Sequence, residues 1–427
     1  MSALIPIKEG QMNFVTPPSF VQLALELESP SKVSSIVDYL SDSLAALHLR
    51  MRSPSEFEFD RKHLIVHDLP KNSAKSLTDA AEYSGLHFTP NQDEAFASIA
   101  IHDNIVVLNA SHRFCDGGFF KFLLSNFPNP PKLWKSDEDW LKSLKDTSRL
   151  VPRFTSDIFG ARANDAPPMK AIPFDPKVTR FVPKMIPSQN SQYRQIKEIR
   201  MLSNEFATYN KAKNAPSSLT ESMWMANYFA LSALNYDKHG KEFFDNFKVH
   251  TVVDLRPYLG YKPDFLSCYH CAHIAPGVSQ IKSNDKIADV GKKIKNDLQR
   301  LLKEGYQYST LKAETSGPLY YGINGSLSQI GRLELKRPII DAHISIRLDA
   351  SKQQSPEKCI GTLGMFSWSV SSPEPSKNHF VTQIGYSGNE LPEEDVNKST
   401  KRIEYFLKNI SHQQTIKEVF DIIKKVE

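Results

Sequence analysis

A proline-rich, aperiodic stretch near the middle of the chain separates two halves with similar patterns. Seven of its residues between 150 and 195 are prolines: Pro152, Pro167, Pro168, Pro173, Pro176, Pro183 and Pro187. Such a stretch is typical of a connection between domains rather than of a helix or a strand. Because 427 residues exceed what one hydrophobic core usually supports, we expect two domains, 1–160 and 196–427, joined by a crossover at 161–195.

In the first half, apolar runs predict a strand, a helix, a hairpin and a second helix. The run at 20–29 predicts a strand, and apolar residues recur at helical spacing between Val33 and Leu47. Two further apolar runs meet at Asp103 and Asn104, which predicts a β-hairpin with its turn there. The glycines of GGFFKFLLSNF, which begins at residue 117, open a helix whose phenylalanines and leucines face inward.

The second half repeats the order strand, helix, strand. Its predicted strands are QIKEIRML, KVHTVVDLRP ending at Pro257, LSCYHCAHI, MFSWSV and HFVTQIGYS. Its predicted helices are one in SNEFATYNKAKNA with Ser203 and Asn204 as cap candidates, one that opens at Thr220, one over 284–304 with a single apolar stripe, and one in EEDVNKSTKRIEYFLKNI. Strands and helices are segregated rather than strictly alternating, which is typical of an α+β protein.

The charge balance and the apolar runs exclude several functional classes. The formal net charge of +5 comes from 53 basic and 48 acidic residues spread along the chain, so no nucleic-acid partner is expected. No run of about 18 apolar residues is present. The N-terminus also lacks the pattern of a signal peptide, and we therefore expect no transmembrane segment and a cytoplasmic protein. Four cysteines suit a reducing compartment.

The segment HRFCDGG, residues 112–118, places a histidine, an aspartate and two glycines directly after an apolar strand. A neutral imidazole at a cleft can take the proton of a hydroxyl or amine that attacks an acyl group, which contributes about 10²–10⁴-fold in rate. Taken alone, His112 is better explained as a strand-end histidine that only satisfies its hydrogen bonds. Asp116 can point away from the ring and brace the loop through a distant cation.

This segment is similar to the His-x-x-x-Asp-Gly motif of the chloramphenicol-acetyltransferase-like superfamily. That superfamily includes plant-type acyltransferases, fungal alcohol acetyltransferases and the condensation domains of peptide synthetases. VVDLRPYLGYKP at 252–263 resembles the Val-Asp-x-Arg segment in the second half of these proteins. SLSQIG at 326–331 resembles a divergent form of their Ser-Asn-x-Gly strand. With the matching order of elements, the resemblance covers nearly the whole chain.

The resemblance implies both a fold and a set of site residues. The fold would be α+β, with two chloramphenicol-acetyltransferase-like α/β sandwich domains packed as a pseudo-dimer around a central channel. His112 would face the channel as the general base, while Asp116 would be structural and paired with Arg256. Gly117 would permit the turn, and Ser328 is the candidate donor of a hydrogen bond to the oxyanion. A carboxylate paired with a guanidinium across the interface would hold the base in place.

The sequence also departs from the family pattern at two places. It lacks the Asp-Phe-Gly-Trp-Gly motif of plant-type acyltransferases, and its nearest aromatic segment is MFSWSV at 365–370. Ser267 and Cys268 replace the glycine and asparagine that usually follow the Val-Asp-x-Arg segment. We therefore expect a protein outside the plant-type branch, with a different channel wall near these residues.

Three other groups of residues have both a functional and a structural interpretation. Cys115 could be a thiol nucleophile, but nothing near it in the sequence would lower its pKa, and core packing is expected. The segment CYHCAH could bind zinc, but on a strand Cys268 and Cys271 point to opposite faces, so no metal is expected. The lysines of the helix over 284–304 could meet the phosphates of coenzyme A or simply face solvent; they are Lys292, Lys293 and Lys295.

These observations predict an acyltransferase that moves an acyl group from a thioester to an alcohol or amine. Acyl-coenzyme A is the expected co-substrate, with no bound cofactor and no covalent enzyme intermediate. One alternative is a condensation-type enzyme whose donor is bound to a carrier protein. Another is a non-catalytic ligand-binding protein of the same fold. A monomer would suffice, because the two domains already form a pseudo-dimer.

Overall fold

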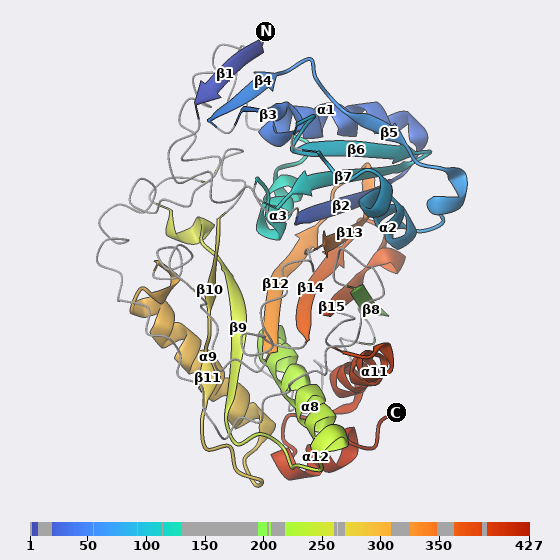
Figure 1. Cartoon of the computed structure of the whole chain (residues 1–427). Helices are drawn as coiled ribbons and strands as arrows, with labels where there is room; N and C mark the ends of the chain where they lie inside the picture. The colour runs from blue at the N-terminus through green and yellow to red at the C-terminus, as the bar shows by residue number, and fades with distance from the viewer. Residues whose placement is uncertain are drawn as a thin grey trace.

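The protein folds into two lobes, one above the other in Figure 1. In this computed structural model the first lobe begins the chain and the second contains the C-terminus. The structure describes residues 2–6, 19–53, 55–91, 93–112, 114–129, 195–202, 205, 218–259, 263, 270–308, 325–347, 363–386 and 391–427. Apart from Gln195, the expected crossover at 161–195 lies outside these residues, and the domain boundaries stay a prediction.

The first lobe is built on a five-stranded sheet in the order β13-β2-β7-β6-β5. Its strands are β2 (Phe20–Leu27), β5 (Val66–Asp68), β6 (Ala97–His102), β7 (Ile105–Ser111) and β13 (Ile339–Arg347). A small sheet in the order β1-β4-β3 adjoins it, with β1 (Ser2–Pro6), β3 (Leu49–Ser53) and β4 (Glu56–Asp60). The helices of this lobe are α1 (Val33–Ser43), α2 (Leu77–His87) and α3 (Gly117–Asn126).

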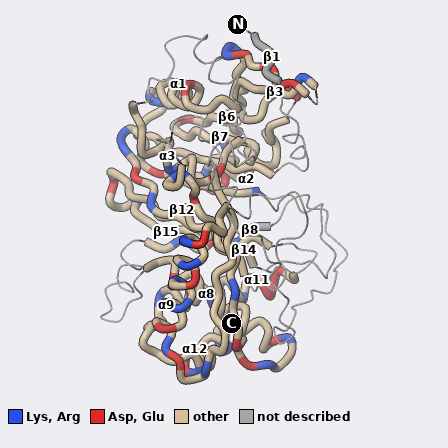
Figure 2. The backbone as a smooth tube through the Cα atoms, turned by 90° about the vertical axis from the view of Figure 1, so that its left-hand side faces the viewer, with Lys and Arg blue, Asp and Glu red and all other residues tan. Residues whose placement is uncertain are grey.

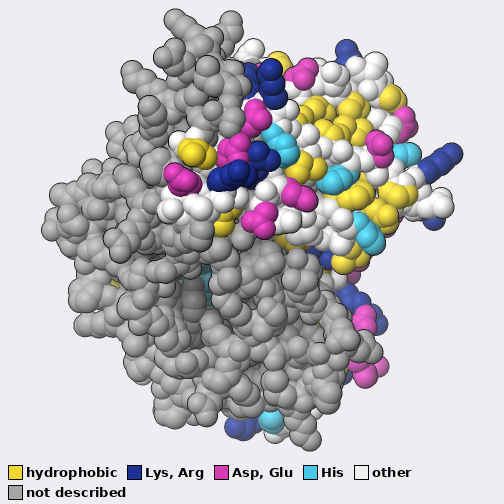
Figure 3. All heavy atoms as spheres, turned by 45° about the horizontal axis from the view of Figure 1, so that its top comes forward, with side chains coloured by type: hydrophobic (Ala, Val, Ile, Leu, Met, Phe, Trp, Pro, Cys, Tyr) yellow, Lys and Arg dark blue, Asp and Glu magenta, His cyan; other side chains and the backbone are white. Residues whose placement is uncertain are grey.

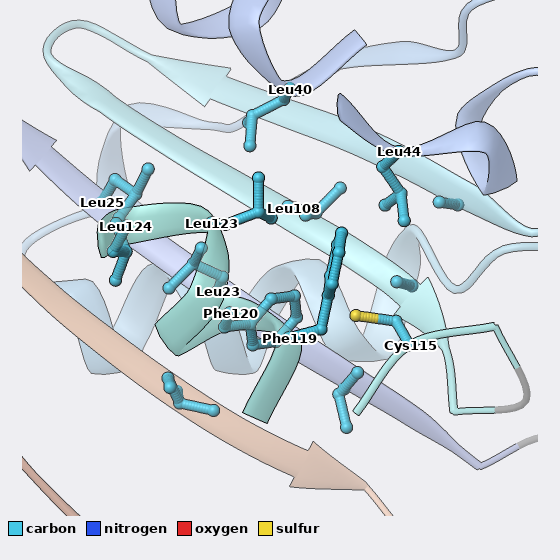
Figure 4. Packing of buried hydrophobic residues seen from close by; sticks show 14 of the residues in the cluster. Leu23, Leu25, Leu40, Leu44, Leu108, Cys115, Phe119, Phe120, Leu123 and Leu124 are labelled. Atoms are coloured by element: carbon cyan, nitrogen blue, oxygen red, sulfur yellow. The ribbon is translucent and has the colours of Figure 1, made fainter. Parts of the chain in front are cut away.

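The predicted strand, hairpin and helices of this half are confirmed. Strands β6 and β7 pair antiparallel, and Asp103 in the turn between them has a φ of 50°, a conformation that aspartate tolerates better than most residues. The second helix, α3, packs its apolar face on the sheet. Figure 4 shows Phe119, Phe120, Leu123 and Leu124 close to leucines of β2 and β7. This packing anchors the segment that follows His112.

The second lobe is built on a sheet in the order β10-β9-β12-β14-β15-β8, with β11 paired to β9. Its strands are β8 (Gln195–Leu202), β9 (Phe247–Asp254), β10 (Cys271–Ile274), β11 (Gly277–Val278), β12 (Gly325–Glu334), β14 (Gly364–Ser371) and β15 (His379–Tyr386). Its described helices are α8 (Leu219–His239), α9 (Ile287–Lys303), α11 (Glu393–Asn409) and α12 (Ile416–Ile423). The core of this lobe lies between the helices and one face of the sheet.

Three boundaries in this half differ from the sequence prediction. Helix α8 begins at Leu219 rather than Thr220, because the side chain of Ser218 accepts a hydrogen bond from the Glu221 backbone and caps it. Strand β9 ends at Asp254 rather than Pro257, because Arg256–Tyr258 form a short 3-10 helix. Of the predicted strand LSCYHCAHI, residues 270–274 are described, and the strand β10 begins only at Cys271, whereas Ser267 and Cys268 lie outside the described residues. Of the predicted helix SNEFATYNKAKNA, only Glu205 is described.

Strand β13 ties the two lobes together, and the sequence analysis did not predict it. Its neighbours in sequence, β12 and β14, pair parallel to each other in the sheet of the second lobe. Between them the chain crosses over, and β13 pairs antiparallel with β2 at the edge of the first-lobe sheet (Figure 1). The lobes are therefore interlocked through the backbone as well as through side chains.

Charged side chains of both signs are distributed over both lobes. Figure 2 shows basic and acidic residues close together along α9 and α12, and Figure 3 shows both signs on the described face of the first lobe. No described helix is long and apolar enough to cross a membrane.

Candidate active site

His112 lies in the turn between β7 and α3, at the junction of the lobes. The apolar strand β7 ends at Ser111, and the backbone N–H of His112 then donates to the carbonyl of Ser19 at 2.8 Å. Phe114 closes the turn by donating its N–H to the carbonyl of Ser111 at 3.0 Å. The side chain of His112 is half-buried and lines a cavity.

The ring of His112 is held by the backbone of its own loop. Its Nδ1 lies 2.9 Å from the carbonyl oxygen of Cys115. A carbonyl oxygen can only accept, so Nδ1 carries the hydrogen, and in the neutral ring the lone pair is on Nε2. This is the tautomer that a general base acting through Nε2 requires.

Asp116 does not contact the ring but binds three donors from both lobes. Its Oδ1 accepts from the Phe119 backbone N–H at 2.8 Å, which caps α3, and from Nη2 of Arg256 at 2.9 Å. Its Oδ2 accepts from the backbone N–H of His270 at 2.7 Å. Because the side chain is almost fully buried, this carboxylate joins the loop of His112 to the second lobe.

Arg256 completes the link from the second lobe. Its Nη1 also donates to Asp254 at 3.0 Å, and only 6% of its side chain is exposed. Burial alone would lower the pKa of the guanidinium, but Asp116 and Asp254 outweigh burial and raise that pKa above its ordinary value. Arg256 therefore stays charged. The structure thus brings together Asp116 and Arg256, which are 140 positions apart in the sequence.

Gly117 and Gly118 are required by close approach rather than by their backbone angles. A Cβ on Gly117 would lie 2.4 Å from Cδ1 of Ile330 in β12, so a side chain here would push α3 away from the second lobe. A Cβ on Gly118 would lie 2.6 Å from Nη1 of Arg256. Neither glycine has a positive φ. The expected role of Gly117 in the turn is therefore one of space, and Gly118 was not singled out from the sequence.

A cavity of about 230 Å³ lies between the lobes, bounded on one side by His112, Asp116, Gly117 and Gly118. The opposite wall is one face of the second-lobe sheet, because paired residues on neighbouring strands point to the same face. Two rows of paired residues cross this face. The first row is His273, Val252, Ser328, Phe366 and Gln383. The second row is His250, Ser326, Gly364, Gly385 and Ile196.

All five of the predicted site residues line this cavity. Ser328 lies in the first row, and His112, Asp116, Gly117 and Arg256 line the same cavity. A second cavity of about 440 Å³ adjoins at Gly118, Asp254 and Arg256, which line both. Arg256 of the ion pair therefore lies at the boundary between the two cavities.

The sequence analysis missed a pair of histidines in the cavity wall. The rings of His250 and His273 stack with centroids 4.5 Å apart and an interplanar angle of 14°. Nδ1 of His250 lies 3.2 Å from the hydroxyl oxygen of Ser326. Burial, reinforced by the neighbouring His273, lowers the pKa of His250 well below its ordinary value. The alternation of polar and apolar residues in β9 was the available signal, since it places His250 on the same face as Asp254.

Cys115 and the lysines of α9 have the structural environments expected for them. Cys115 is fully buried beside Phe119 in the first-lobe core (Figure 4). Cys268 lies outside the described residues, whereas Cys271 lines the cavity. Within the described ranges, no group of three or more His, Cys, Asp or Glu side chains could hold a metal ion. Two of the α9 lysines form partly exposed ion pairs, Lys293 with Asp285 at 3.7 Å and Lys295 with Glu221 at 3.6 Å.

Comparison with known proteins identifies the fold. No protein-family model matches the sequence, and no curated protein matches it. Among solved structures, the first condensation domain of the CDA synthetase is similar, with 12% identity, a TM-score of 0.57, and coverage of 97% of this chain and 98% of that chain. The chain has the fold of a condensation domain.

Two further structures extend this comparison. The epimerization domain from the third module of tyrocidine synthetase B is 13% identical, with a TM-score of 0.56, and covers 99% of this chain and 97% of its own. Polyketide synthase associated protein 5 from Mycobacterium tuberculosis is 12% identical, with a TM-score of 0.55, and covers 96% and 99%. The predicted fold class, two chloramphenicol-acetyltransferase-like lobes around a central channel, is therefore confirmed over nearly the whole chain.

Proposed function

We propose that the protein is an acyltransferase that moves an acyl group from a thioester to an alcohol or amine, with His112 as the general base. The observation that carries this proposal is the state of the ring: Nδ1 is held by the Cys115 carbonyl in a cavity between the lobes, so Nε2 has the lone pair that accepts a proton. A histidine that only completed its hydrogen bonds at a strand end would have no need of a cavity in front of it.

The reaction would proceed in two steps without a covalent enzyme intermediate. In the first, Nε2 of His112 takes the proton of the acceptor hydroxyl or amine while its oxygen or nitrogen bonds to the thioester carbonyl carbon, giving a tetrahedral oxyanion. Ser328, on the facing wall, would donate its hydroxyl hydrogen to this oxyanion. In the second step the carbon–sulfur bond breaks, and the imidazolium returns the proton to the leaving thiolate.

The ion pair of Asp116 and Arg256 would position the base in this reaction. The loop of His112 is connected to the second lobe through this carboxylate, whereas the oxyanion donor Ser328 belongs to the second lobe itself. Base and oxyanion donor can act on one carbonyl group only if the lobes keep their separation, because misplacement by about 1 Å costs about 100-fold in rate. Arg256 and Asp116 are therefore positioning residues.

Two thioester donors agree with this site. Free acyl-coenzyme A is the first proposal. The solved structures of similar fold include condensation domains of peptide synthetases, which favours a carrier-protein-bound donor as the second candidate. A non-catalytic ligand-binding protein is the third, and the intact base and ion pair argue against it.

The experiment combines both donors with a pool of alcohols and amines and detects acylated products by mass spectrometry. Acyl-coenzyme A of several chain lengths and the same acyl groups on a phosphopantetheinylated carrier protein are tested with the wild type, His112→Ala and His239→Ala. His239 is exposed at the end of α8, so its variant serves as a matched control. We expect product with the wild type and the control only, and the donor that yields product identifies its class. Folded wild type that forms no product with any donor would contradict the proposal and favour the ligand-binding alternative.

A further inference from the structure

Two glycines form a gap in the wall of the cavity. Gly364 in β14 and Gly385 in β15 are directly paired across the strands, and both line the cavity. Glycine in the interior of a strand weakens it, and its presence often marks a place where a ligand or another backbone approaches closely. Neither has a positive φ, so backbone conformation does not require glycine at these positions.

The described part of the chain does not fill the space above these glycines. A Cβ built on Gly364 would lie 3.7 Å from its nearest neighbour, the carbonyl oxygen of Gly385. A Cβ built on Gly385 would lie 3.9 Å from the carbonyl oxygen of Gly364, and both distances are ordinary van der Waals contacts. Elsewhere in the chain glycine is needed for packing. A Cβ on Gly325, for example, would lie 2.0 Å from Oδ1 of Asn227. The gap at Gly364 and Gly385, which we call the glycine slot, therefore belongs to the cavity and not to the core.

The glycine slot lies within reach of a substrate held at His112. The start of α3 lies over Ile330 and Phe366, because a Cβ on Gly117 would be 2.4 Å and 3.5 Å from their side chains. Gly364 is two residues from Phe366 along β14, which corresponds to about 6.6 Å at 3.3 Å per residue. A chain attached to a carbonyl group near His112 would thus extend over Phe366 into the slot.

The two ends of the cavity differ in polarity. The second row ends beyond Gly385 at the apolar Ile196 of β8, and the apolar side chains of Phe366 and of Ile346 from β13 line the same cavity. At the other end of the two rows lie the polar side chains of His250 and His273, with Ser326 between His250 and Gly364. An apolar chain is therefore favoured at the slot, and a hydroxyl or amine acceptor is favoured at the histidine end.

A buried amide beside the slot supplies a second, independent indication of a ligand. Gln383 is only 3% exposed and lines the cavity next to Phe366. Its Nε2 donates to Oε2 of Glu198 at 3.2 Å, which orients the amide. Its carbonyl oxygen Oε1 has no hydrogen-bond partner within the described part of the chain. A buried acceptor without a donor is destabilising, and a ligand carrying an N–H or O–H group would satisfy it.

We propose that the glycine slot takes an unbranched acyl chain of medium length and that Gln383 accepts a hydrogen bond from an N–H or O–H group on the same ligand. This inference rests on the proposed function and names its donor class: an acyl thioester longer than acetyl, whose tail lies in the slot while the acceptor occupies the histidine end. The hydrogen-bond donor for Gln383 is either a hydroxyl on the acyl chain or an amide of the pantetheine arm.

The test measures binding without turnover. S-ethyl-, S-hexyl- and S-decyl-coenzyme A are thioethers that cannot react, and their dissociation constants are measured by titration calorimetry with the wild type and Gly364→Val. We expect wild-type affinity to rise with chain length. The affinity of Gly364→Val for the decyl compound should be at least tenfold lower than that of the wild type, and its affinity for the ethyl compound less than twofold lower, because only the longer chain reaches the slot.

The matched control is Gly291→Ala, a glycine of α9 whose added Cβ would lie 3.4 Å from Cβ of Glu221 and outside the cavity. Its affinities should stay within twofold of the wild type for all three thioethers. Melting temperatures establish that each variant is folded. The proposal for the slot would be overturned if wild-type affinity did not depend on chain length. It would also be overturned if Gly364→Val lowered the affinities for the ethyl and decyl compounds equally.

A fourth thioether, S-(3-hydroxydecyl)-coenzyme A, tests Gln383 with the variant Gln383→Met. Loss of affinity confined to the hydroxydecyl compound identifies an acyl hydroxyl as the donor, and equal loss for all coenzyme A thioethers identifies a pantetheine amide. Unchanged affinity for every compound would overturn the part of the inference that concerns Gln383. The failure of this inference and the failure of the proposed function can be told apart. If the slot binds acyl chains but no acceptor yields product, only the proposed acyl transfer is contradicted. If acyl transfer occurs and Gly364→Val leaves its dependence on chain length unchanged, only the slot is contradicted.

Discussion

Two polar clusters join the lobes at opposite edges of the second-lobe sheet, and they differ in the kinds of side chains that build them. The first is the ion pair of Asp116 and Arg256 with Asp254. In the second, Nη2 of Arg200 donates to Asp341 at 3.0 Å and lies 3.1 Å from Nδ1 of His379. The first cluster pairs a guanidinium with two carboxylates, whereas the second also contains a histidine ring.

The second cluster also includes a histidine that burial keeps neutral. In His343 of β13, Nδ1 lies 3.7 Å from Oε2 of Glu198, and Nε2 lies 3.3 Å from Nε2 of Gln383. Burial, with Arg200 and His379 adding to it, lowers the pKa of His343 to about 3. The comparison shows that an ion pair without histidines holds the junction beside His112, while the junction beside the glycine slot includes two histidines whose pKa values are lowered by burial.

The largest effect is expected from breaking the first cluster on one side. Arg256→Met leaves Asp116 buried without its cation, and removal of one partner of a buried pair costs about 3–5 kcal/mol. Urea unfolding of wild type and variant measures this loss in the free energy of unfolding. A loss below about 1 kcal/mol would show that the pair does not hold the lobes together.

A smaller effect is expected when both partners are replaced. Asp116→Asn keeps an oxygen that can cap α3 and removes the charge, so the double variant with Arg256→Met should recover part of the stability, with a coupling energy of about 0.5–3 kcal/mol. The exposed pair of Arg61 and Asp42, at 2.7 Å, is the reference cycle and should couple by less than about 1 kcal/mol. Equal coupling in both cycles would remove the distinction between buried and exposed pairs.

The second cluster should make stability depend on pH. Between about 6.5 and 3 the unfolded chain protonates its histidine at position 343 while the folded protein does not, so the free energy of unfolding falls as pH is lowered through this window. The slope from one such group is at most about 1.4 kcal/mol per pH unit.

The measurement is urea unfolding of the wild type and His343→Leu at several values of pH between 3 and 7. The variant should show a shallower decline than the wild type, because one titrating group is gone. Burial raises the pKa of Glu198, and this acts with the opposite sign in both proteins, so the difference between them isolates His343. Parallel curves would contradict the lowered pKa of His343.

The smallest effect is expected away from both clusters. Lys293 and Lys295 of α9 are partly exposed and pair with acidic residues, so a double change of these lysines to alanine should leave the KM for the thioester within twofold of the wild type. A tenfold or greater rise in KM would show that this helix binds the donor and that the binding surface extends well beyond the cavity.

Much of the fold was predictable because the elements have clear hydrophobic periods. The amphipathic stripe of α9 and the hairpin of β6 and β7 can be read within short windows. Strand β13 was missed although apolar and polar residues alternate from Ile340 to Arg347 as in a strand. Its pairing with β2, which is distant in sequence, could not be read within a short window. The site was partly predictable: the resemblance proposed the pairing of Asp116 with Arg256, which the structure shows.

Other parts of the site depend on how strands that are distant in sequence align with one another, which no short stretch of sequence reveals. The pairing of Gly364 with Gly385, and that of His250 with Ser326, follow from which strands are neighbours and how they are aligned. A glycine in a strand looks the same in sequence whether it is needed for packing, as Gly325 is, or leaves a gap. The difference appears only when the surrounding atoms are in place.

The most direct test of the account is the initial rate of thiol release from an accepted acyl thioester, measured for the wild type and His112→Ala with the acceptor present and absent. Loss of the general base should lower the acceptor-dependent rate by about 10²–10⁴-fold, with the His239→Ala control unchanged. An acceptor-dependent rate in folded His112→Ala equal to that of the wild type would contradict the claim that His112 performs the proton transfer in this cavity.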